Sequence, residues 1–142
     1  MLSVTGPATY TSSYLPYPDD LSIFSFKKTN NTEYECIIQS NSNSPAYLII
    51  PYEYNGIAVT CVSATANGTG KPNITEVYLP PTVTSLGYGA FDNCRNLEFD
   101  KINTDHITNI VGGNAFSSCN KFVDVSFPSI TSISGNSFLA RC

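Results

Sequence analysis

The chain has few of the residues on which catalytic and nucleic-acid sites commonly depend. It has 142 residues with no Trp, one Met and one His, and charged residues make up only 13% of it. Seven Lys plus Arg against eleven Asp plus Glu give a net charge of −4, which leaves no basic stripe to meet a phosphate backbone. We therefore expect no nucleic-acid partner, and the length suits about one domain.

Long apolar runs are also missing. The longest, from Ala46 to Pro51, is only as long as a strand, whereas a membrane-spanning helix needs about 20 apolar residues. The first residues, Met1 to Pro7, carry neither basic charge nor a continuous apolar stretch, so they are unlike a signal peptide. We expect no membrane span, and either a protein that acts where it is made or one whose leader is not part of this chain.

Small uncharged polar residues are abundant instead, with 17 Ser, 14 Thr and 14 Asn. Because their side chains bond to nearby backbone groups and compete with the helix ladder, they favour strands and turns. Nine Gly, nine Pro and nine Tyr point the same way. The composition predicts a mainly β protein or a solenoid.

The five cysteines reveal a repeat. Their odd number argues against a closed set of disulfides, and Cys94, Cys119 and Cys142 lie 25 and 23 residues apart. Apolar and small residues fall into register on this spacing. The first unit contains Ile74, Val77, Leu79, Pro80, Val83, Leu86, Ala90, Phe91 and Cys94, the second Leu97, Phe99, Ile102, Ile107, Ile110, Ala115, Phe116 and Cys119, and the third Phe122, Val125, Phe127, Pro128, Ile130, Ile133, Phe138 and Cys142. Such a period predicts leucine-rich repeats, whose turns bury their apolar faces by stacking, with the cysteines as small packing residues.

The same positions resemble a known family. Val77-Tyr78-Leu79-Pro80, Val83-Thr84-Ser85-Leu86-Gly87, Ala90-Phe91 and Cys94 are similar to the BspA-type leucine-rich repeat of bacterial and protozoan surface proteins. Residues 127–133 resemble a variant of this motif, and Leu48 to Pro51 with Asn55-Gly56 and Val59-Thr60 resembles the first turn. The resemblance implies adhesion or protein binding and supplies no catalytic residues. One departure is the second unit, which has Asn103 where Pro is usual and two inserted residues.

From this repeat we predict a short, mainly β leucine-rich-repeat solenoid of about four turns, with parallel strands on one face. An extended arm occupies residues 1–21 and the solenoid residues 22–142. Within the solenoid, a hairpin and first turn cover residues 22–73, and the repeats cover residues 74–96, 97–121 and 122–142. The hairpin is expected from Phe24 to Ser40, around Asn30-Asn31.

Both ends suggest contacts with other chains. The arm is rich in Tyr and Pro, a composition that gives an extended, mobile segment unless it lies on another surface. The last turn has no polar cap, which terminal repeats normally need. The chain is therefore expected to be an assembly component or a fragment of a longer array. The candidate assembly contacts are Tyr10, Tyr14, Tyr17 and Phe138.

Enzyme chemistry is not expected. His106, the only histidine, lies in the inserted loop of the second unit, away from the core positions of the cysteines. No close Cys pair has zinc-site spacing, and Gly68-Thr69-Gly70 and Gly87-Tyr88-Gly89 lack the third glycine and the lysine of a phosphate loop. We predict no catalytic residues, no metal and no cofactor. Disulfides between Cys36 and Cys61 or between Cys94 and Cys119 stay open as minor alternatives.

The candidate binding surface is the outer side of the strand that opens each turn. Because alternate strand residues face opposite sides, Val77, Leu79, Phe99, Val125 and Phe127 are expected to face inward. The outward residues form an acidic strip with one aromatic: Glu76, Tyr78, Glu98, Asp100, Asp124 and Ser126. A second candidate is the loop with Tyr47, Tyr52 and Tyr54, since Tyr supplies contact area at low entropy cost.

Two functions remain. The first is a non-enzymatic binding module at the cell surface or outside the cell, which recognises a protein or cell-surface partner. The alternative is a structural subunit of a larger particle, such as a phage decoration, fibre or receptor-binding component of a virion.

Overall fold

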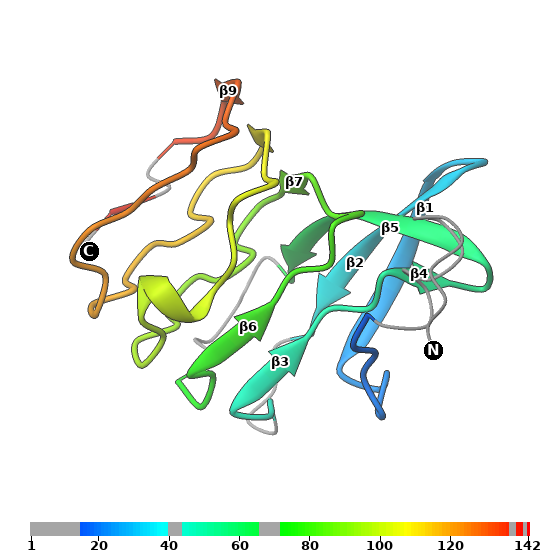
Figure 1. Cartoon of the computed structure of the whole chain (residues 1–142), viewed down its shortest axis with the longest axis horizontal. Coiled ribbons are helices and arrows are strands. Elements are labelled where there is room, and N and C mark those ends of the chain that lie inside the picture. Colours follow the sequence, from blue (N-terminus) through cyan, green and yellow to red (C-terminus); the bar gives the residue numbers. More distant parts are fainter. Residues whose placement is uncertain (1–14, 40–43, 66–71, 137–138, 141) are drawn as a thin grey trace, which may run out of the picture.

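The structure is a computed structural model that describes residues 15–39, 44–65, 72–136, 139–140 and 142. In this part of the chain, extended turns stack one beside the next from the N-terminal hairpin to the last turn (Figure 1). The predicted Tyr10, Tyr14 and Phe138 and the loop Gly68-Thr69-Gly70 lie outside the described residues. No helix in the described part is long and apolar enough to cross a membrane.

An antiparallel hairpin opens the fold. Strand β1 (Phe24–Asn30) pairs with β2 (Glu33–Ile38), as the sequence predicts. The turn forms because the Asn30 side chain accepts a hydrogen bond from the Thr32 backbone N–H at 2.8 Å and donates one to Glu33 at 2.7 Å. Asn side chains stabilise turns in this way by imitating backbone groups.

A parallel ladder continues from the hairpin through every turn. Strand β2 pairs with β5 (Ile57–Ala64), and β7 (Ser85–Leu86), β8 (Asn109–Ile110) and β9 (Ser132–Ile133) follow in order. Strand β4 (Glu53–Tyr54) joins β5 antiparallel across Asn55-Gly56. These two residues have φ of 52° and 76°, the conformation that a two-residue hairpin turn of type I′ requires. The parallel solenoid predicted from the repeat is confirmed.

The sequence missed which segment carries the longest ladder. It runs through the matching triplets Thr84-Ser85-Leu86, Thr108-Asn109-Ile110 and Thr131-Ser132-Ile133. The strand that opens each turn instead forms a small second sheet, in which β3 (Tyr47–Ile49) pairs in parallel with β6 (Glu76–Tyr78) (Figure 1). A single bridge from Val77 to Ile102 extends it.

Identical residues stack in the core between the two sheets. Phe91 and Phe116 are fully buried, with ring centroids 5.6 Å apart and planes 20° apart. The Cys119 thiol donates to the Phe91 carbonyl across 3.2 Å, and the Cys142 thiol donates to the Phe116 carbonyl across 3.1 Å. Cys94 and Cys119 are buried packing residues as predicted, whereas Cys142 is exposed. The five cysteines are free thiols, so neither suggested disulfide is formed.

Backbone contacts between turns depend on threonine and glycine. Thr108 donates its N–H (2.8 Å) and its hydroxyl (3.2 Å) to the Thr84 carbonyl, and Thr131 repeats both bonds to Thr108. Next to this ladder, Gly112 and Gly135 sit where turns come closest: a Cβ on Gly112 would lie 2.2 Å from the Tyr88 nitrogen. Only a residue without a Cβ allows this approach.

The last described turn is less covered than predicted. The sequence places Val125 and Phe127 inward, but Val125 is 41% exposed and Phe127 is half-buried. Phe127 still packs against Phe99 and Phe116, with ring centroids 5.4 and 5.9 Å away. Val125 is therefore exposed and not buried as an inward position would suggest, since no later turn of the described chain covers it.

Candidate functional site

The small sheet builds the candidate surface. In its parallel register Tyr47 lies opposite Glu76 and Ile49 opposite Tyr78, while Leu48 and Val77 between them are buried. Since strand residues alternate between faces, the neighbours of the buried Leu48 and Val77 face outward. Tyr47 and Glu76 are exposed and Tyr78 is half-buried on that face.

The repeat 97–121 contributes to this surface with a different backbone structure from the one predicted. The sequence expects Glu98 and Asp100 on a strand, but a 3₁₀ helix, η1 (Phe99–Lys101), lies there. The short helix lies directly before Ile102, which bridges Val77, so the structure places the extra residues of this unit here and not in the loop with His106. As a result Asp100 and Lys101 border the small sheet.

Together these elements enclose a surface hollow of about 300 Å³, which we call the Tyr78 hollow. Its lining is Tyr47, Glu76, Val77, Tyr78, Asp100, Lys101 and Asn103. Asn103 holds the two turns together here, because its side chain accepts from the Leu79 N–H at 2.9 Å and donates to the Leu79 carbonyl at 2.7 Å. This amide supplies two backbone-like bonds between neighbouring turns.

The phenol of Tyr78 stays protonated over the ordinary pH range. Burial, with a smaller contribution from Tyr47, raises its pKa above the usual value. A protonated phenol can donate and accept hydrogen bonds. The hollow therefore offers a polar tip on an aromatic ring beside two carboxylates and one ammonium.

The structure brings only half of the predicted strip together. Glu76, Tyr78 and Asp100 line the Tyr78 hollow. Glu98, Asp124 and Ser126 are exposed but do not line it. The carbonyl of Ser126 instead accepts a hydrogen bond of 2.8 Å from the Thr104 hydroxyl.

Two of the three tyrosines of the second candidate surface, Tyr52 and Tyr54, pack within the chain. Tyr54 stacks on Phe26, with centroids 3.8 Å apart, and meets Tyr34 edge-on at 5.3 Å. The Tyr52 ring meets Tyr17 edge-on at 5.3 Å. Their neighbour Tyr47 is the one that joins the small-sheet surface.

Tyr17 is the predicted assembly residue that the structure describes. Its hydroxyl donates to the Glu53 carbonyl at 2.9 Å, so this part of the arm lies on the solenoid of its own chain. A contact of Tyr17 with another chain stays a prediction.

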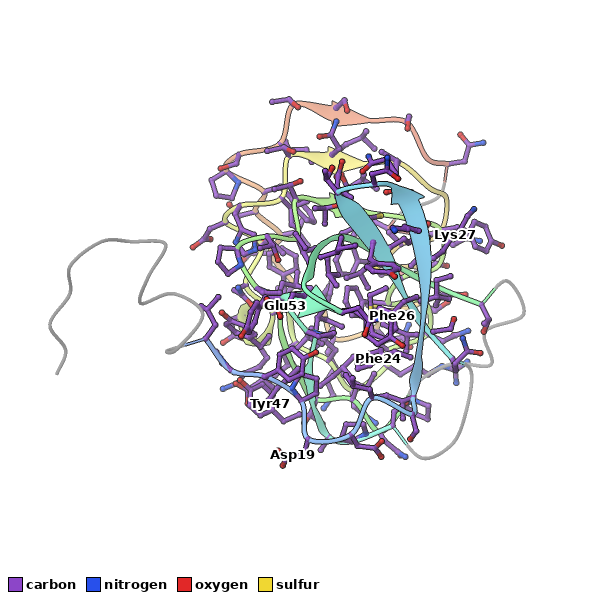
Figure 2. The ribbon with its side chains drawn as sticks, turned by 90° about the vertical axis from the view of Figure 1, so that its right-hand side faces the viewer. Asp19, Phe24, Phe26, Lys27, Tyr47 and Glu53 are labelled. Atoms are coloured by element: carbon purple, nitrogen blue, oxygen red, sulfur yellow. The ribbon has the colours of Figure 1, made fainter. Side chains whose placement is uncertain are left out.

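A second hollow, which Tyr47 also lines, was not predicted. It measures about 280 Å³, and we call it the Asp19 hollow. Its lining is Pro18, Asp19, Asp20, Ile23, Phe24, Pro45, Tyr47, Leu48 and Ile49. Figure 2 shows Asp19 and Tyr47 in the lower part of the molecule, with Lys27 higher up at the right-hand side. The sequence signal was the Pro18-Asp19-Asp20 run at the end of the arm, which linear alternation along the repeats does not reach.

The groups weighed for chemistry lie apart from these hollows. His106 makes a 2.8 Å hydrogen bond through Nε2 with the Pro80 carbonyl. Burial is the main cause that raises the pKa of the Cys61 thiol, to about 12, and the Glu35 charge adds to it; such a thiol is a poor nucleophile near neutral pH. Among the described residues, no three His, Cys, Asp or Glu side chains are grouped to hold a metal ion.

Comparison with known proteins points to one repeat family. The family model described as "BspA type Leucine rich repeat region (6 copies)" matches residues 69–142. No curated protein matches the chain.

Three solved structures share the fold. A leucine-rich repeat protein from Bacteroides ovatus is 28% identical with a TM-score of 0.60, over 79% of this chain and 30% of that one. A leucine rich cell surface protein from Faecalibacterium prausnitzii is 21% identical with a TM-score of 0.57, over 87% and 33%. The T. pallidum leucine-rich repeat protein is 19% identical with a TM-score of 0.53, over 80% and 62%. The chain thus spans less than two thirds of each of these proteins.

Proposed function

The chain belongs to the BspA-type leucine-rich repeat family, and from this membership we propose that it is a recognition module that binds a protein partner through the Tyr78 hollow. Leucine-rich repeats present repeated strand surfaces to protein ligands. The observation that carries the proposal is the convergence of Tyr47, Glu76, Tyr78 and Asp100 from three successive turns on one hollow. Aromatic rings with a few placed polar groups are typical of recognition surfaces.

We further propose that this recognition takes place at the cell surface, in adhesion. The name of the F. prausnitzii protein, a leucine rich cell surface protein, supports this location. Membrane-impermeant biotin applied to intact cells that express the chain tests it. The chain should be labelled before lysis, and labelling only after lysis would contradict a surface location.

Peptide display tests the recognition surface directly. The folded chain is used to select from a random peptide library, and selected peptides are then measured against Tyr47→Ala and Tyr78→Ala. Tyr88→Ala is a matched control, because Tyr88 is 47% exposed and does not line the hollow. We expect binding to fall with the two hollow variants and to persist with the control. Peptides that bind all three variants alike would place recognition elsewhere and refute the proposal.

The alternative, a subunit of a larger particle, draws support from Val123, Val125 and Ile133, which are 89%, 41% and 46% exposed on the last described turn. Exposed apolar groups of this size commonly mark contacts with other proteins. Light scattering over a concentration series tests it. Self-association that Val123→Ser and Ile133→Ser abolish would support the subunit, and a monomer at every concentration would count against it.

A further inference from the structure

The two hollows share one lining residue, Tyr47. Tyr47 lines both the Asp19 hollow and the Tyr78 hollow and is itself 44% exposed. The two volumes are similar, about 280 and 300 Å³, which is space for one side chain or a small group each. We call the two hollows together the Tyr47 groove.

The groove is strongly acidic for a chain with so few charges. Asp19 and Asp20 line one hollow and Glu76 and Asp100 the other, with Lys101 as the sole cation among the lining residues. The local net charge is therefore −3, compared with −4 for the whole chain. The Ser22 backbone N–H, 2.8 Å from Asp20, lowers the pKa of that carboxyl, so it stays ionised well below neutral pH.

The aromatic part of the groove suits a cation as well. A Lys or Arg head group placed over a Tyr face is attracted by the ring, and Arg can also bind a carboxylate through two hydrogen bonds. In an extended peptide, side chains on the same face are about 7 Å apart, because each residue advances about 3.3 Å. Because the two hollows share Tyr47, we expect alternate side chains of one extended peptide to reach both.

We propose that the Tyr47 groove binds an extended, positively charged polypeptide segment, with cationic side chains in the two hollows that share Tyr47. This proposal rests on the recognition function proposed above and names its class of partner. A single metal ion fits the groove less well, because the carboxylates are divided between two hollows and no metal-binding cluster occurs among the described residues.

The test measures fluorescence anisotropy with three labelled octapeptides in which Val alternates with Lys, Gln or Glu. We expect the Lys peptide to bind the chain at least about tenfold more tightly than the Gln peptide, and the Glu peptide not to bind. Raising the salt concentration should weaken the Lys peptide, since exposed charges are screened. A Lys peptide that binds no more tightly than the Gln peptide would overturn the proposal.

Matched variants separate a local site from general attraction. Asp19→Asn and Glu76→Gln each remove one groove carboxylate, and Asp124→Asn removes an exposed carboxylate outside it. We expect the first two variants to weaken binding of the Lys peptide about two- to fivefold, the magnitude of one exposed ion pair. The third variant should leave its affinity unchanged. Equal weakening by all three would mean attraction by net charge alone and refute the groove.

Lys101 gives a test in the opposite direction. Lys101→Gln removes the only cation in the lining, so the Lys peptide should bind about two- to fivefold more tightly; weaker binding would contradict the proposal.

The two proposals also fail separately. If display-selected peptides depend on Tyr47 and Tyr78 while the Lys peptide does not bind, recognition stands and the cationic partner is wrong. If a glycan rather than any peptide binds in a Tyr47-dependent way, both are wrong.

Discussion

Gly112 marks a close approach of two turns, and replacing it with Ala tests whether that approach stabilises the fold. A Cβ at this position would lie 2.2 Å from the Tyr88 nitrogen and 2.6 Å from its Cα. These are backbone atoms, which cannot rotate out of the way as a side chain can. Gly112→Ala must therefore push the turn that contains Gly112 away from the turn that contains Tyr88.

The cost follows from the bonds that span this point. Val111 donates to the Leu86 carbonyl at 2.8 Å, and Gly89 donates to the Gly113 carbonyl at 2.9 Å. Weakening two such bonds costs about 1 kcal/mol each, and overpacking adds ~1–3 kcal/mol. We expect Gly112→Ala to lower the free energy of unfolding by ~3–5 kcal/mol, whereas Ala at an unstrained glycine with free space raises it by ~0.4–1 kcal/mol.

Urea unfolding followed by circular dichroism measures the effect against two control glycines. At Gly113 a Cβ would lie 3.1 Å from the Asn136 carbonyl oxygen, so Gly113→Ala should cost less. At Gly56 nothing lies within 4 Å, but φ is +76°, and Gly56→Ala should cost ~1 kcal/mol through backbone strain alone. A Gly112→Ala variant within ~1 kcal/mol of the wild type, or one less damaging than Gly113→Ala, would refute this reasoning.

Three further predictions concern the core and the join between turns. Phe116→Ala should cost ~3–5 kcal/mol because Phe116 is fully buried, and chemical denaturation should show a clearly smaller loss for the half-buried Phe127→Ala; equal losses would contradict the stacked core. Asn103→Ala removes both bonds to Leu79 and should cost ~1–3 kcal/mol, seen as a lower urea midpoint, and an unchanged midpoint would show that the amide does not join the turns. The folded Cys61 thiol keeps its proton up to a pKa of about 12, while the unfolded thiol loses it near pH 8.5, so stability should fall above about pH 9. In unfolding at pH 9.5 and 10.5, Cys61→Ala should reduce this fall by ~1.4 kcal/mol per pH unit, and identical slopes would argue against a buried, protonated thiol.

Most of the fold could be predicted from the repeat period. Residues that recur every 23 to 25 positions, such as Phe91 and Phe116 or Thr84 and Thr108, stack on one another in the structure, because equal spacing along the chain becomes adjacency between turns. The ladder of threonine triplets was visible as a pattern, but its role as the main sheet was not. Short polar triplets with one apolar residue carry too little alternation to be recognised as strands.

The site was only partly predictable for the same reason. Alternation placed Glu76 and Tyr78 outward correctly, since β6 is a strand. Glu98 and Asp100 are exposed as well, but the strand expected there is wrong, because a 3₁₀ helix with another period occupies Phe99–Lys101. The Asp19 hollow depends on how the end of the arm lies against Tyr47 and Phe24. The Pro18-Asp19-Asp20 run marks one side of this contact in the sequence, but it does not indicate which distant residues the run meets.

The threonine ladder also bears on how a gene for such a chain can change length. Each turn receives on one side the same backbone and hydroxyl bonds that it gives on the other, as Thr108 does between Thr84 and Thr131. A duplication or loss of one whole turn beyond Thr108 would therefore preserve the pattern of threonine bonds between neighbouring turns. The residues that line the Tyr47 groove belong to the arm and to the turns up to Asn103. A change in the number of turns beyond Thr108 would therefore leave the lining of the groove unchanged.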